Sequence, residues 1–372
     1  MSHGHPQSVR RRALRGAVGL LVAALLIGAG ALGAHLVRTR YALPTADLLG
    51  ESASPSPTAT PRPTVMPGAN ITGPLNILLV GIDTRESVPD WEPHADAVLI
   101  LHVDQRLDRG YLVSLPRDLL VDIPAFPPAG FDGGWSKLTH AMSYGSHRPD
   151  GGRPDPAQGF QLLAKTVSAY TGIPRFDAGA VLNFRGFQNL VDAIGGVDLY
   201  IDQRVPSLHR RPDGGMRALS GTGYTGPQMV YEPGYRHLNG WQALDYARQR
   251  YISGGDYARQ RHHQQLIKAI LRKVTDRQLA TDPVAIDRVL QALGETLIFD
   301  GRGREPIDFA FALRRLSPSA LTLVGLPGSA VYSEGNYVGE NLDPVGRDFL
   351  TELRAGRAAA FLEAHPQLVI TG

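Results

Sequence analysis

Three short, uninterrupted apolar runs constrain the fold of this chain more than any other feature. They cover residues 75–82, 97–103 and 111–115, and a polar turn at 105–110 separates the second run from the third. Apolar runs of this length without alternation are typical of strands buried on both faces, and the short turn predicts a hairpin. Further strands are predicted at 179–183, 197–201 and 321–326.

Apolar residues with helical spacing occupy much of the chain between these strands. Helices are predicted at 158–171, 184–194, 240–247, 256–274, 284–297, 307–316 and 345–354. Strands that interleave with helices favour an α/β fold, and we expect a three-layer α-β-α sandwich with a central mixed sheet. In such folds ligands bind where the loops at the strand ends converge.

A long apolar segment lies near the N-terminus. Residues 16–34 carry no charged side chain, and the apolar character continues to residue 37. Because roughly 20 apolar residues cross a bilayer core, one transmembrane helix is predicted at 16–37. A cleaved signal peptide is the alternative, with Ala29, Ala31 and Ala34 near its end, but its apolar region is usually shorter, about 7–15 residues.

The charges around this segment predict its orientation. Four arginines precede it and two follow it, so residues 1–15 are expected to form a cytoplasmic tail. The protein would then be a single-pass type II protein of the cell membrane, with its main domain extracytoplasmic. Residues 38–73 are rich in Pro, Ser and Thr and are predicted to be an extended linker.

The charge and cysteine content exclude several classes of site. The net charge of +3 arises from arginines in residues 1–40, and the rest of the chain carries 32 basic and 35 acidic side chains. This balance argues against a nucleic-acid-binding face. The chain has no cysteine, so any metal ion must be bound by oxygen or imidazole ligands.

Arginine and carboxylate side chains cluster at separated places, each at the edge of an apolar run. The clusters are Asp83 with Arg85, Asp96, Arg117 with Asp118, and Arg248 with Arg250, Asp256 and Arg259. Guanidinium groups match phosphate oxygens, and carboxylates hold divalent cations. If the fold brings the clusters together, they predict a pocket for a phosphate-rich ligand and a divalent cation.

Seven segments in order carry a resemblance to a known family. They are NILLVGIDTR (76–85), DAVLILHVD (96–104), LVSLPRDLLVDIP (112–124), SKLTHAMSYG (136–145), VLNFRGFQNLVDAIGGVDLYI (181–201), LNGWQALDYARQR (238–250) and GDYARQRHHQQLIKAI (255–270). With these segments the chain resembles the LytR-CpsA-Psr proteins of bacterial cell envelopes. The resemblance implies a catalytic domain at 74–276, and residues 277–372 are expected to complete the same domain.

The family resemblance implies an enzyme, a phosphotransferase. It would move a glycopolymer from an undecaprenyl-pyrophosphate carrier onto peptidoglycan, at the outer face of the membrane and with Mg²⁺, or alternatively Mn²⁺, as cofactor. Its partners would be the polyprenyl-pyrophosphate glycolipid and peptidoglycan. A pyrophosphate hydrolase and a non-catalytic envelope sensor, or transcriptional attenuator, are the alternatives.

The resemblance also assigns roles by position. Asp83 and Asp96 would hold the metal ion, while Arg117, Arg248 and Asp256 would be catalytic. The pyrophosphate would be bound by Arg85, Arg117, Lys137, Arg248, Arg250, Arg259 and Gln260.

The chain departs from the family pattern at one position. His94 stands where the family commonly has an arginine, and an imidazole loses its charge above its usual pKa near 6.5.

One apolar stripe has two interpretations. Phe184, Phe187, Leu190, Val191 and Ile194 share one helix face, and we interpret them as core, although the family has a lipid-binding tunnel in this region.

Overall fold

The computed structural model describes residues 46–50, 68–83, 90–221, 223–249, 251–274, 289, 291–292, 294–313 and 315–370. Within these ranges, six strands form a mixed sheet in the order β13-β6-β1-β2-β3-β14. Their bounds are β1 Leu75–Ile82, β2 Ala95–Val103, β3 Gly110–Leu115, β6 Ala178–Asn183, β13 Leu297–Asp300 and β14 Leu321–Gly325. β2 is antiparallel to both β1 and β3, which confirms the predicted hairpin, while β1 is parallel to β6 and β3 is parallel to β14.

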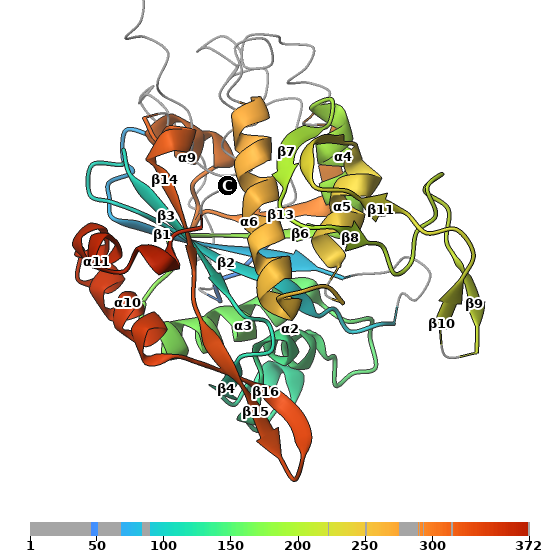
Figure 1. Ribbon diagram of the computed structural model, residues 1–372. Helices are drawn as coiled ribbons and strands as arrows, with labels where there is room; N and C mark the ends of the chain where they lie inside the picture. The colour runs from blue at the N-terminus through green and yellow to red at the C-terminus, as the bar shows by residue number, and fades with distance from the viewer. Residues whose placement is uncertain are drawn as a thin grey trace, which may run out of the picture.

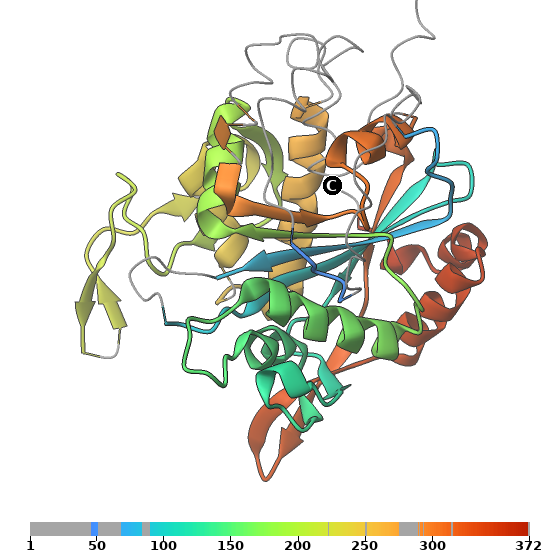
Figure 2. The same cartoon turned by 180° about the vertical axis from the view of Figure 1, so that it is seen from behind.

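Helices cover both faces of the sheet, because successive side chains of its strands point to opposite faces. On β1, Leu75 and Ile77 belong to one apolar core, and Leu78 and Val80 belong to the other. The first core includes residues of α4 Phe184–Ala193, α5 Gly240–Arg248, α6 Gly255–Val274 and α9 Pro306–Ala312. The second includes residues of α2 Leu138–Ser146, α3 Pro156–Thr171, α10 Pro344–Arg354 and α11 Ala358–Ala364. The predicted α/β architecture with a central mixed sheet is confirmed, and Figures 1 and 2 show the helices on either side of it.

Short two-stranded elements surround this sandwich. They are β4 Leu120–Ile123 with β5 Gly134–Lys137, β7 Val197–Ile201 with β12 Gly234–Leu238, β8 Val205–Pro206 with β11 Val230–Tyr231, β9 Ala218–Ser220 with β10 Gly223–Thr225, and β15 Gly328–Ser333 with β16 Asn336–Leu342. The predicted strand at 197–201 is present, but it pairs with β12 and not with the central sheet. In Figure 1 the β9–β10 hairpin projects from one side of the molecule, and the β15–β16 hairpin projects from the bottom.

The helix prediction at 284–297 is wrong at its C-terminal end. Leu297 begins β13, and the preceding residues Gly294–Thr296 form a single 3₁₀ turn. β13 pairs with the edge of β6 that faces away from β1, and Leu297 and Phe299 are buried there. Pairing with the sheet therefore determines the conformation of this segment. Of the other predicted helix residues, 289, 291 and 292 are helical, while 284–288, 290 and 293 lie outside the described residues.

Part of the predicted linker packs against the core. Leu48 is fully buried, and the backbone N–H groups of Leu48 and Leu49 donate hydrogen bonds to the Asp300 carboxylate at 3.0 and 3.1 Å. Ile71, near the end of the linker range, is also buried. The predicted transmembrane helix at 16–37 lies outside the described ranges, and no helix within those ranges is long and apolar enough to cross a membrane.

We expect Leu48→Ala to lower the free energy of unfolding by about 3 kcal/mol, because it removes a fully buried side chain and leaves a cavity. Urea unfolding measures this loss. Leu49→Ala is the matched control, since Leu49 is only half-buried and should cost clearly less. Equal losses in the two variants would show that residues 46–50 do not pack as described.

Candidate active site

The ends of three strands bring the predicted acidic and basic residues to one edge of the sheet. Asp83 directly follows β1, and Asp96 is the second residue of β2. Because β1 and β2 are antiparallel and Gly81 pairs with Ala97, the two aspartates lie at the same edge. Arg117 follows the C-terminal end of β3, where Leu115 pairs with Val98 of β2, so it joins them there.

Two helices place further arginines above this edge. Arg248 is the last residue of α5, which begins with a capping box between Asn239 and Gln242. The chain reverses at the start of α6, where Gly254 and Gly255 adopt φ angles of +88° and +51°, a conformation that other residues rarely adopt. This sharp reversal brings Arg259, in the second turn of α6, to the same edge as Arg248.

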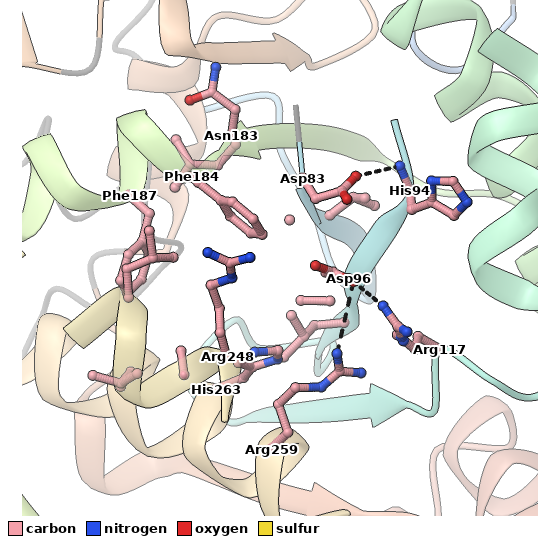
Figure 3. A pocket seen from close by; sticks show the side chains of 18 of the residues that line it. Asp83, His94, Asp96, Arg117, Asn183, Phe184, Phe187, Arg248, Arg259 and His263 are labelled. Carbon is pink, nitrogen blue, oxygen red and sulfur yellow. Dashed lines mark hydrogen bonds and ion pairs between the residues drawn. The ribbon is translucent and has the colours of Figure 1, made fainter. Parts of the chain in front are cut away.

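Asp96 is the carboxylate that these arginines share. It accepts a short hydrogen bond from Arg117, and the Arg259 Nη1 lies 3.8 Å from its Oδ1 (Figure 3). Burial would raise the pKa of Asp96, but the positive charges of Arg259, Arg117 and Arg248 outweigh burial and lower it. Asp96 is therefore ionised at neutral pH.

Asp83 is held by the backbone of the residue that precedes the second strand. It is 8% exposed, and its Oδ1 accepts a hydrogen bond from the His94 backbone N–H at 2.8 Å. Within the part of the chain described, no three acidic or histidine side chains are grouped to bind a metal ion. Asp83 and Asp96 nevertheless line one cavity, and Mg²⁺ is commonly bound by one or two carboxylates together with substrate phosphates. The donor set therefore fits this ion.

A cavity of about 460 Å³ opens behind this charged rim, between the sheet and helices α4, α5 and α6. Its walls are largely apolar and are formed by Leu79, Ala97, Leu99, Ala180, Leu182, Phe184, Phe187, Leu244, Ala247, Leu266, Ile267 and Leu297. Small residues keep it open: a Cβ atom added at Gly81 would lie 3.3 Å from the Ala97 Cβ. The site thus combines a polar, cationic mouth with an apolar interior.

Phe184 and Phe187 correct the interpretation of the α4 stripe. Both line the cavity, and the Arg248 guanidinium carbon lies 4.6 Å from the centre of the Phe184 ring, a cation–π contact. Leu190, Val191 and Ile194 are buried in the core, as interpreted. The sequence pattern could not separate the two groups, because one helix face packs on the sheet at one end and faces the cavity at the other.

The structure brings together Asp83, Asp96, Arg117, Arg248 and Arg259, which all line the cavity. Arg85 and Arg250 lie outside the described residues, as do the side chains of Asp256 and Gln260 on α6, so their roles remain predictions. Lys137 is not part of the cavity lining; its Nζ lies 3.8 Å from Asp118 Oδ2.

Sequence reasoning missed several other residues of the cavity lining. They are Trp91, Asn183, His209, Tyr251 and His263. Asn183 carried a detectable signal, because it ends a predicted strand of the same sheet and pairs in register with Ile82. His263 also carried one, because it lies one helical turn after Arg259 on the same face of a predicted helix, whereas Trp91, His209 and Tyr251 had no such signal.

His94 and His263 both line the cavity, but their imidazole rings have different surroundings. The His94 Nδ1 lies 3.1 Å from the Glu92 carbonyl oxygen, and its ring lies 5.7 Å from that of Trp91. His263 lies one helical turn after Arg259. Burial and the nearby Arg259 charge lower its pKa to about 3, although Asp96 acts in the opposite direction, so the ring is neutral at pH 7.

Comparison with known proteins identifies similar chains. The model of the LytR_cpsA_psr family matches residues 50–351. "Biofilm regulatory protein A" of Streptococcus mutans is 29% identical over 60% of this chain and 49% of its own length, so the chain spans about half of that relative. "Polyisoprenyl-teichoic acid--peptidoglycan teichoic acid transferase TagU" of Enterococcus faecalis is 28% identical over 68% of this chain and 71% of its own length. The crystal structure of protein gbs0355 from Streptococcus agalactiae has the same fold, with a TM-score of 0.59 and 22% identity over 76% of this chain and 87% of that one.

The lowered pKa of His263 predicts a pH dependence of stability. Its ordinary pKa is near 6.5 and its folded pKa is about 3, so between these values the folded state binds fewer protons than the unfolded state. Stability should therefore fall as the pH decreases from about 6.5, by about 1–2 kcal/mol at pH 5 relative to pH 7. Urea unfolding of His263→Gln at both pH values should show a smaller drop, with the exposed His237→Gln as control. An unchanged drop in His263→Gln would contradict this assignment.

Proposed function

The chain belongs to the LytR-CpsA-Psr family, and from this premise we propose that it transfers a glycopolymer from a polyprenyl-pyrophosphate donor to peptidoglycan. A single observation carries the proposal: one cavity combines a rim of guanidinium and carboxylate groups with an apolar interior. A lipid pyrophosphate has the same two parts, an anionic head and an apolar chain. The relative named as a polyisoprenyl-teichoic acid to peptidoglycan transferase supports this class of donor and acceptor.

The arginines would bind the pyrophosphate of the donor. Arg117 and Arg259 are already oriented by Asp96, and Arg248 is held over Phe184 at the cavity wall. Charge that is positioned before the reaction stabilises the transition state without further rearrangement. Asp83 and Asp96 would hold Mg²⁺ or Mn²⁺, which supplies further neutralisation of the phosphate oxygens when it is bound.

The proposed reaction is a displacement at phosphorus. A hydroxyl oxygen of peptidoglycan attacks the phosphorus that carries the glycopolymer, and the bond from that phosphorus to the bridging oxygen breaks. The products are a phosphodiester between glycopolymer and peptidoglycan, and a polyprenyl monophosphate as leaving group. The hydroxyl proton passes to a base, for which Asp256 remains the sequence-based prediction.

The apolar interior would hold the beginning of the polyprenyl chain. Phe184 and Phe187 on one side and Ala97 and Leu99 on the other offer it an apolar surface next to the charged mouth. The location follows from the same proposal. With the predicted anchor at 16–37, the cavity would lie outside the cytoplasm, close to a lipid donor in the outer leaflet.

Transfer from a polyprenyl-pyrophosphate oligosaccharide to peptidoglycan fragments, with and without Mg²⁺, tests the proposal. We expect Asp83→Asn and Asp96→Asn each to lower kcat by about 10²–10³-fold, because each removes a carboxylate from the charged rim. Asp348→Asn, at an exposed position on α10, is the matched control and should keep full activity.

Two outcomes of this assay would contradict the proposal. Release of polyprenyl phosphate without an acceptor product would identify a hydrolase. Donor binding without turnover, equal with and without Mg²⁺, would identify a sensor.

The size of the cavity predicts a dependence on donor chain length. Ala97→Leu adds bulk to the cavity wall opposite Gly81, so it should lower kcat/KM for a long polyprenyl donor by about 10-fold or more. A donor whose prenyl chain is too short to fill the apolar interior next to Ala97 should be affected by no more than about threefold. Ala97→Gly, which adds no bulk, is the control. Equal losses for long and short donors would place the lipid chain elsewhere.

A further inference from the structure

A second set of side chains adjoins the charged rim on its outer side. The Asp118 carboxylate follows Arg117 and lies 3.4 Å from its Nε. The Tyr337 hydroxyl shares its proton between this carboxylate, at 3.3 Å, and the Glu340 carboxylate, at 3.2 Å. The Asp118 carboxylate also lies 3.8 Å from the Lys137 Nζ. Lys137 in turn lies 4.6 Å from the centre of the Tyr337 ring. Asp118 therefore links the phosphate-binding edge of the sheet to residues that do not line the cavity.

The topology explains why Tyr337 is at this place. β14 is parallel to β3, so both strands end at the same edge of the sheet, and β14 leads directly into the β15–β16 hairpin. The hairpin is tied back to the loop after β3, because the Glu340 backbone N–H donates to the Asp118 carbonyl oxygen at 2.9 Å. Figure 1 shows β15 and β16 next to β4 below the sheet.

Aromatic rings continue outward from Tyr337 across this surface. Tyr332 lies beside it on the hairpin, with ring centres 6.0 Å apart. Trp135 lies two residues before Lys137 on β5, so both side chains are on the same face of that strand. The exposed fractions are 75% for Trp135, 64% for Tyr332 and 39% for Tyr337. We refer to Trp135, Tyr332 and Tyr337 as the aromatic strip.

The surroundings of the strip indicate the chemistry of its occupant. Ser333, Asn336 and Asn341 are exposed on the same hairpin, and no large aliphatic side chain among the described residues of β4, β5, β15 and β16 is exposed to a similar degree. Membrane-binding and protein-binding surfaces usually present a contiguous apolar patch, whereas here the rings stand among polar side chains. Exposed rings that alternate with hydroxyl and amide groups instead match a pyranose, whose C–H face packs on an aromatic ring while its hydroxyls form hydrogen bonds.

We propose that the aromatic strip binds the glycan strand of the peptidoglycan acceptor and guides it to the phosphoryl group at Arg117. This rests on the proposed function, in which the lipid chain occupies the cavity and the acceptor hydroxyl must approach from outside. Tyr337 of the strip contacts Asp118, which adjoins Arg117 of the rim, and none of the three aromatic side chains lines the cavity. The strip therefore connects the reaction centre with the open surface along which a long polymer can lie.

Steady-state transfer kinetics of the full chain, with glycan fragments from a muramidase digest as acceptor, test the strip. We expect Trp135→Ala/Tyr332→Ala to raise the acceptor KM at least about 10-fold, with less than about threefold change in kcat and in the donor KM. Both side chains are largely exposed, so the variant should fold normally, which its thermal unfolding checks. Tyr235→Ala is the matched control: Tyr235 is 81% exposed and also forms an edge-to-face pair, with Tyr200, on the distant β7–β12 element.

Each outcome of these measurements supports or contradicts acceptor binding by the aromatic strip. An unchanged acceptor KM in the double variant, or an equal rise in Tyr235→Ala, would overturn it. A rise in the donor KM alone would also overturn it, because the strip would then hold the donor glycan. If the wild-type chain transfers nothing, the proposed function fails, and a binding experiment then tests the strip by itself. Quenching of tryptophan fluorescence by the same glycan fragments in the wild type, but not in Trp135→Ala, would support glycan binding by the strip. Absence of this quenching in the wild type would overturn the proposal.

Discussion

The shared ion pairing of Asp96 is the interaction on which the site depends. Arg117 comes from the end of β3 and Arg259 from α6, and both are drawn to one carboxylate at the start of β2. Without that negative charge, the guanidinium groups would repel one another across a short distance in a partly desolvated edge. Asp96 therefore lets several cations gather before any ligand is present. Folding therefore orients hydrogen-bond donors for an anionic ligand before such a ligand binds.

The cavity beneath these charges reflects a balance between stability and function. Protein interiors are usually close-packed, and an unfilled volume lowers stability. Here Gly81, Ala97 and Ala180 are too small to fill the space between the sheet and α4. The extensive cores on both faces of the sheet, which contain large buried side chains such as Phe160, Phe299 and Phe349, make this loss tolerable. The small residues are thus a feature of the site, because larger ones would pack better and leave no room for a ligand.

The sequence predicted the parts of this molecule that local patterns determine. The apolar runs gave β1, β2, β3 and their hairpin, and the positions of Asp83, Asp96 and Arg117 at strand ends were enough to place them at one edge. It could not predict what tertiary packing decides. Leu297 continues a helical pattern but pairs with β6, and Lys137 occurs in a family motif but lies outside the cavity lining. Phe184 and Leu190 share a helix face, yet only the arrangement of α4 over the sheet determines that one lines the cavity and the other is core.

The C-terminal part of the chain contains none of the seven family segments, yet it has a large role in the fold and at the edge where the site lies. β13 and β14 are the outer strands of the central sheet, on opposite sides, so residues after 277 complete the same sheet that carries Asp83 and Asp96. Parallel pairing with β3 also dictates where β14 ends, which is beside Arg117. Whatever follows β14 must then emerge at the edge where the arginine and aspartate side chains lie, and in this chain it is a hairpin with exposed tyrosines. One pairing of strands thereby both completes the fold and brings a distant segment to the mouth of the cavity, where we propose that the acceptor approaches.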